Sequence, residues 1–190
     1  IKSDSTNQQS TRRLQASVRA VALAALAANG KIDKAELIRY QSHVADMDLF
    51  GKAHYLQAAT SLKLEEQTLL NLSQDILSYS VQSGGKFQFS QASFYGASSI
   101  HSTPMRSNCA ILTSLLEVSS TSKKSLSIIG DVPFKQVRAI TQTRGGRDYW
   151  SNTQENLYCI NALINFSQVY ESEPPNIQLK AESVSEKYAI

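Results

Sequence analysis

Two kinds of helical segment alternate along this chain, and this alternation constrains the fold more than any other feature. Three segments are dense in small and aliphatic residues, at 19–26, 108–115 and 157–163, and a fourth, 48–60, fits the class less well. More polar segments lie between them, at 33–44, 64–81 and 133–143. A curved array of helical hairpins needs such alternation because its inner helices are covered on more sides than its outer ones. The pattern therefore predicts an all-α helical-hairpin array, either an open solenoid or a closed α/α toroid, with a plain irregular bundle as the alternative.

The first half of the chain is predicted to hold four helices. Over residues 12–29, apolar side chains recur at three- and four-residue steps, as on one face of a helix: Leu14, Val18, Val21, Ala22, Ala25 and Leu26. Asn29-Gly30 ends this helix as a left-handed C-cap would. Asp33 and Asp48 are the predicted N-caps of helices that run to about residue 44 and to residue 60. A fourth helix is expected over 64–81, and the short connections predict antiparallel neighbours.

Between residues 83 and 103 the pattern changes from helical to alternating. Gly84-Gly85 breaks the helix, residues 86–90 alternate as a strand does, and 93–102 is a loop rich in Ser and Gly. We therefore expect a short β-hairpin-like insertion near 84–95. Thr103 and Pro104 are the predicted cap and first residue of a helix to about residue 119, because proline loses nothing by lacking an N–H at that position.

The last third is predicted to contain a link, two helices and a change of structure. A Ser/Lys-rich link is expected over 119–127, then a helix from Pro133 to about residue 143 and a turn at Gly145-Gly146. The last helix, 151–169, begins with a capping box, either Ser151 with Gln154 or Asn152 with Glu155. Residues 173–176 then stop the helix, and the alternation from Ile177 predicts a strand.

The domain boundary is expected near residue 172. Residues 1–172 then form the helical domain, and 173–190 form a linker and the first strand of a following β domain. The polar stretch 3–10 reads as a loop. Because a lone strand cannot bury a face by itself, and because the chain opens without Met, we expect a fragment of a longer protein.

Composition excludes several classes of function. The hydrophobic share is 42%, which is enough for a packed core. The net charge is +3, and no basic run exceeds Arg12-Arg13 or Lys123-Lys124, so nucleic acid is not an expected partner. No apolar run is long enough to span a bilayer, so this segment is not expected to insert into a membrane.

The cysteines and histidines predict no metal site and no cofactor site. Cys109 and Cys159 lie inside apolar runs; one disulfide is possible, but we expect two buried free thiols, because free Cys behaves as a small hydrophobe. Neither cysteine belongs to a Cys-x-x-Cys pair, and His43, His54 and His101 are scattered, which argues against zinc.

Residues 144–156, RGGRDYWSNTQEN, resemble the end of the thioester domain of alpha-2-macroglobulins. The family pattern there is a glycine turn, Trp, Ser/Thr-Thr-Gln-Glu-Asn and an Ala-Leu-rich helix, which 159–163 matches. The stretches 19–30, 48–53 and 102–110 are similar to the bacterial branch, and order and spacing agree over about 10–172. Residues 173–176 resemble the exit into the β-sandwich domain that follows.

This resemblance implies an α/α toroid and a broad-spectrum endopeptidase inhibitor of the protease-trap type. A protease cuts a bait region, the parent rearranges, and a Cys–Gln thioester acylates a lysine of the attacker, since proximity favours that amine. The thioester motif, Cys-x-Glu-Gln, is absent here and belongs upstream in the family. The resemblance thus implies a scaffold segment with no catalytic residue, in a periplasmic lipoprotein, often anchored at the inner membrane, whose partners are proteases and β-sandwich neighbours.

Several conspicuous residues have ordinary structural explanations. Trp150 is expected to be a packing anchor, and Thr153, Gln154 and Glu155 to satisfy free N–H groups in the first helical turn. His101, beside Ser102, is expected to be an ordinary polar residue of a loop. A hydrolase site would need a Gly-x-Ser-x-Gly motif or a suitably positioned acidic residue, and neither accompanies it. The aromatic residues Phe87, Phe89, Phe94 and Tyr95 could equally form a contact surface for neighbouring domains or pack locally.

Two other functions remain open from the sequence. Tyr149-Trp150 is similar to the aromatic repeats of toroid enzymes of the cyclase or prenyltransferase type. Those enzymes need an Asp-rich motif, whereas only Asp46 and Asp48 lie close together here. The chain could also be a helical interaction module without chemistry, which would describe a thioester-less paralogue.

Overall fold

The computed structural model describes residues 2–91 and 103–171, with side chains described from residue 9 onward. Over these residues the chain is mostly helical, with one small antiparallel hairpin. The predicted loop 93–102, the strand after Ile177, and the side chains of Phe94, Tyr95 and His101 lie outside the described residues.

Four helices form a row: α1 (Lys2–Ala28), α3 (Leu49–Ser61), α5 (Pro104–Ser119) and α8 (Thr153–Tyr170). Within the row, α3 packs between α1 and α5, and α5 packs between α3 and α8. The first turns of α3, α5 and α8 meet, since Arg106 contacts both the Phe50 ring and Gln154. These are the four apolar segments of the sequence, now placed side by side.

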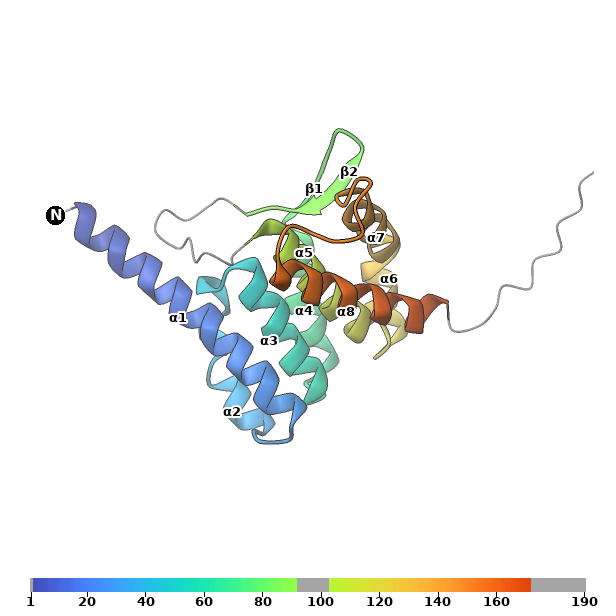
Figure 1. The fold of residues 1–190 in the computed structure, drawn as a ribbon. Helices are drawn as coiled ribbons and strands as arrows, with labels where there is room; N and C mark the ends of the chain where they lie inside the picture. Colours follow the sequence, from blue (N-terminus) through green and yellow to red (C-terminus); the bar gives the residue numbers. More distant parts are fainter. Residues whose placement is uncertain (1, 92–102, 172–190) are drawn as a thin grey trace, which may run out of the picture.

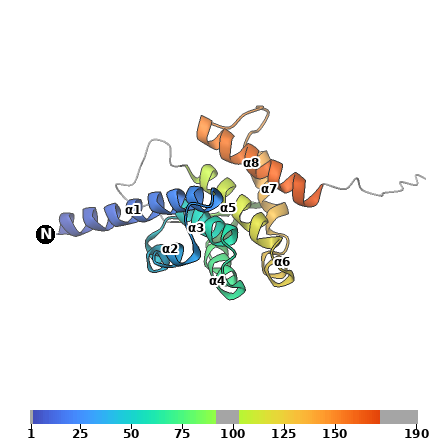
Figure 2. The same cartoon turned by 90° about the horizontal axis from the view of Figure 1, so that it is seen from below.

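The more polar helices lie outside the row. They are α2 (Lys34–Ile38), the 3-10 helix η1 (Gln41–Asp46), α4 (Glu66–Leu77), α6 (Lys123–Ile129) and α7 (Val132–Gln142). Helices α2, α4 and α6 lie on one side of the row, as the view from below shows (Figure 2). The prediction of a mostly helical chain is therefore confirmed for the described residues, and the apolar segments lie side by side with polar helices next to them. The hairpin of β1 (Ser80–Ser83) and β2 (Lys86–Phe89) projects from the helices, with Ser80 paired to Phe89 and Ser83 to Lys86 (Figure 1).

The N-caps predicted at Asp33, Asp48 and Thr103 and the C-cap predicted at Asn29-Gly30 are confirmed, and each depends on local hydrogen bonds. The Asp33 and Asp48 carboxylates accept from the N–H groups of Glu36 and Gly51, and the Thr103 hydroxyl accepts from that of Arg106. Gly30 has φ +62° and ends α1 in a Schellman motif, in which the Lys31 N–H donates to the Leu26 carbonyl.

Two loop predictions are wrong because helix replaces loop. The polar stretch 3–10 is the beginning of α1; extending an existing helix costs far less than nucleating a new one. The expected Ser/Lys-rich link at 119–127 contains α6, which Ser122 caps by accepting from the Ser125 N–H.

Two helices are shorter than predicted. The segment 33–44 splits into α2 and η1, and α4 ends at Leu77 instead of Val81. Val81 belongs to β1, because the chain turns at Gly84-Gly85 and pairs with β2. The hairpin therefore occupies Ser80–Phe89, earlier than the expected 84–95.

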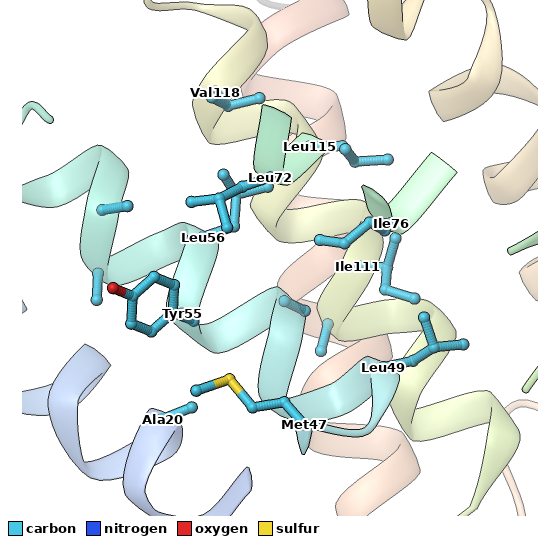
Figure 3. Packing of buried hydrophobic residues seen from close by; sticks show 14 of the residues in the cluster. Ala20, Met47, Leu49, Tyr55, Leu56, Leu72, Ile76, Ile111, Leu115 and Val118 are labelled. Carbon is cyan, nitrogen blue, oxygen red and sulfur yellow. The ribbon is translucent and has the colours of Figure 1, made fainter. Parts of the chain in front are cut away.

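The main core lies between the row and its outer layer. Figure 3 shows Tyr55 and Leu56 of α3, Leu72 and Ile76 of α4, and Ile111 and Leu115 of α5 converging there, with Met47 and Ala20 close by. Tyr55 is fully buried, and its hydroxyl donates to the Leu37 carbonyl at 3.0 Å. Burial raises the pKa of Tyr55 to about 12, so the phenol remains a hydrogen-bond donor at neutral pH.

Candidate functional site

The residues that carry the resemblance gather at the start of α8 and bond to one another. The Trp150 N–H donates to Asn156 Oδ1 at 2.9 Å, and Asn156 Nδ2 donates to the carbonyls of Trp150 and Asn152. Asn152 Oδ1 accepts from the Glu155 N–H, while Glu155 Oε2 accepts from the Ser151 N–H. Asn152 is thus the N-cap of α8. Glu155, which is 5% exposed, accepts from the N–H of Ser151, the residue before this cap.

Trp150 is a packing anchor, as predicted. The residue is buried, and its indole N–H donates to the Ile140 carbonyl in α7 at 3.2 Å. The Arg144 guanidinium lies over the indole ring, 4.9 Å from its centroid. Gln154, in contrast, bonds another helix: its Oε1 accepts from Arg106 Nη1 of α5 at 3.2 Å.

The expectation of two free thiols is wrong, because Cys109 of α5 and Cys159 of α8 form a disulfide. Both residues are fully buried, so the prediction that they lie in apolar surroundings is confirmed, whereas the prediction that they are unpaired is wrong. Sequence alone could not place the two helices side by side, and only their contact brings the sulfur atoms together. The disulfide and the Arg106–Gln154 hydrogen bond lie one turn apart along the same α5–α8 contact.

A second group of side chains joins three helices of the row, and we call it the three-helix cluster: Phe50 and His54 of α3, Arg106 of α5, and Gln154 and Tyr158 of α8. The Phe50, His54 and Tyr158 rings contact one another edge to face, with centroids 4.5–5.8 Å apart. The Arg106 guanidinium lies 3.9 Å from the centroid of the Phe50 ring. Sequence reasoning missed this cluster because its members come from three separate segments.

Burial dominates the electrostatics of the three-helix cluster. Burial is the main reason that the pKa of His54 falls from 6.5 to about 4. The interaction with Gln57 opposes this shift, the charge of Arg106 adds to it, and Asp48 opposes it. Burial also raises the pKa of Tyr158, which the charge of Arg106 opposes. At neutral pH the imidazole is therefore uncharged, and its Nε2 is buried without a hydrogen-bond partner among the described residues.

A polar contact continues from the cluster along α3 and α5. Gln57 Nε2 donates to Glu117 Oε1 at 3.1 Å, and burial raises the pKa of Glu117 while this bond lowers it. On the other side of α3, the buried Lys52 ammonium pairs with Asp75 and lies over the Tyr79 ring. These contacts join α3 to α5 and to α4. Gln57, Glu117, Lys52 and Asp75 therefore all have a structural role as hydrogen-bond or ion-pair partners.

A cavity lies at another place, between the α3–α4 and α5–α6 connections. Its volume is about 360 Å³, and Thr60, Lys63, Leu69, Thr121 and Ser122 are among its lining residues. The hydroxyls of Thr60 and Thr121 donate to carbonyls of their own helices, and Ser122 caps α6. Three of the lining side chains therefore already form hydrogen bonds at helix ends.

The described residues hold no group of three or more His, Cys, Asp or Glu that could bind a metal ion. Among the same residues, no helix is both long and apolar enough to cross a membrane. Comparisons of the chain with protein-family models, curated proteins and solved structures each find no match.

Proposed function

We propose that this chain is the C-terminal portion of the thioester domain of a bacterial alpha-2-macroglobulin-like protease trap, and that it serves as scaffold. In this proposal residues 1–172 are part of an α/α toroid, and 173–190 are the linker and first strand of the next β-sandwich domain. A row of apolar helices backed by polar ones supports the proposal, because a ring of helical hairpins has the same two layers.

One observation carries the scaffold role. The residues that resemble the family, from Arg144 to Asn156, use their side chains to build the start of α8 and to join it to α5 and α7. A reacting group would need a polar atom directed at a substrate. Here the indole, amide and carboxylate groups of this motif bond to backbone or to Arg106, which is what a structural element requires.

The proposed chemistry belongs to the parent protein. Its thioester would acylate a lysine of a protease that has cut the bait region, and this segment would hold the ring that shields the thioester from water. The segment itself is not proposed to be an enzyme and would use no cofactor. We place the parent in the periplasm, with an inner-membrane anchor through its own N-terminus, and the Cys109–Cys159 disulfide supports an oxidising compartment.

The test uses the full-length parent protein, before and after methylamine, without reductant. We expect a mass gain equal to one methylamine and the appearance of one thiol. Because Cys109 and Cys159 are bonded to each other, they contribute no thiol to this count. The double variant C109A/C159A is the matched control and should release the same single thiol. Unchanged mass and thiol count would contradict the covalent trap and favour a thioester-less interaction module.

A further inference from the structure

The two end helices of the row, α1 and α8, carry apolar side chains on faces that no described residue covers. The inner members α3 and α5 each have neighbours of the row on two opposite sides. Helix α1 packs on α3 alone within the row, and α8 packs chiefly on α5. A helix that is apolar on opposite faces is normally covered on both.

Helix α8 has one buried face and one exposed apolar stripe. The buried positions recur every three or four residues: Glu155, Cys159, Ala162 and Phe166. The stripe consists of Leu157, Ile160 and Ile164, which are 56%, 49% and 49% exposed. With 3.6 residues per turn, these three side chains centre on the side of the helix opposite to the buried face.

Helix α1 has the same construction. Its buried positions are Ala16, Ala20, Leu23 and Ala27. The apolar series noted in the sequence lies on the other side, where Leu14 is 49% and Val18 61% exposed, and Ala22 and Ala25 are exposed with them. Most of the residues that mark this helix in the sequence are therefore ones that it leaves exposed here.

We propose that the α1 and α8 stripes are docking surfaces for two further apolar helices of the parent polypeptide, which extend the row at both ends. The argument is continuity with the interfaces already formed: α3 and α5 are covered on both sides by helices of the same apolar kind. Residues 92–102, rich in Ser and Gly, and 172–190, with two prolines and an alternating pattern, lack the sequence of such a helix. The inference rests on the proposed function, in which further hairpins of the same domain would supply both helices.

Cysteine labelling of the full-length parent tests this inference. Single substitutions I160C and V18C place a thiol on each stripe, and Q74C and S127C place one at an exposed polar position of the outer helices α4 and α6. Under non-reducing conditions, we expect maleimide to label I160C and V18C at least about ten times more slowly than the matched controls. Peptide mapping assigns each label to its site. Equal rates at stripe and control positions would overturn the inference.

Two further outcomes separate the occupants and the hypotheses. Protection that is lost on dilution would show that a second copy covers the stripes, which also overturns the inference. Protected stripes in a parent that does not react with methylamine would support the extended row and contradict the thioester. A methylamine adduct in a parent with unprotected stripes would support the thioester and contradict the extended row.

Discussion

A β-carbon on Gly51 would lie 2.8 Å from the Cα of Ser17, which is closer than such atoms approach in real structures. Helices α1 and α3 therefore touch at backbone level. The Ser17 hydroxyl also accepts from the Asp48 N–H at 2.9 Å, one turn before Gly51. This contact fixes the packing of α1 on α3, and it explains the glycine in the first turn of α3.

The substitution G51A should separate α1 from α3. Because the clash involves backbone, we expect a loss of about 1–3 kcal/mol in the free energy of unfolding. Gly146 is the matched control, since its added β-carbon would meet nothing within 4 Å. Urea denaturation compares the two, and a G51A protein as stable as G146A would contradict the close approach.

Removing the disulfide should destabilise the fold. The bond closes a loop between residues 50 apart, and chain entropy predicts a cost of about 4 kcal/mol for its loss, with measured values commonly 2–4 kcal/mol. We expect C109A/C159A to unfold on heating at a clearly lower temperature than the unsubstituted protein. Alkylation without reductant is the direct check of the bond, because any modification of the unfolded protein at Cys109 or Cys159 would show free thiols.

His54 should make stability fall in mild acid. Burial lowers the pKa of His54 from 6.5 to about 4, so between these values the unfolded chain binds more protons than the folded one. The free energy of unfolding therefore decreases as pH falls from about 6.5 to about 4, by up to about 3 kcal/mol at 1.4 kcal/mol per unit.

The variant H54Q should lose this part of the pH dependence. Denaturation at pH 7 and pH 4.5 measures the difference, and H43Q, at a half-buried position of η1, is the control that should retain it. If H54Q and the unsubstituted protein show the same slope between these pH values, His54 is not the group responsible.

Lys63 should be a position where glycine stabilises. It ends α3 with φ +53°, in a Schellman motif like that of Gly30: the Leu64 N–H donates to the Ala59 carbonyl. A side chain in the left-handed region costs energy that glycine does not. We expect K63G to gain about 0.5–1 kcal/mol and G30A to lose about 1 kcal/mol, as measured by chemical denaturation. A K63G variant that is less stable would indicate that the lysine side chain compensates for its backbone.

Features that depend on neighbouring residues could be predicted from the sequence. Asp33, Asp48, Thr103 and Asn152 cap helices through hydrogen bonds to N–H groups three residues later, so the cap and the helix start appear together in the sequence. The apolar periodicity likewise predicted that the chain is mostly helical, because a helix places side chains three and four residues apart on one face.

Features that depend on distant segments could not be predicted. Ser80–Ser83 is a strand because β2 pairs with it, not because of its own pattern. The three-helix cluster brings Phe50, Arg106 and Tyr158 together from separate helices, and no local signal marks them. The Cys109–Cys159 bond was missed for the same reason: its formation depends on how α5 and α8 pack.

The disulfide also changes what a cut in this chain would do. The connection between α7 and α8, at Gly145, Gly146 and Arg147, is exposed and lies between the two bonded cysteines. If a protease hydrolysed a peptide bond there, the two pieces would remain one covalent molecule, and α8 would stay attached to α5. In denaturing gel electrophoresis, a nicked chain would then migrate as a single species until a reductant separated its two pieces. Such a cut would leave the row of helices in place.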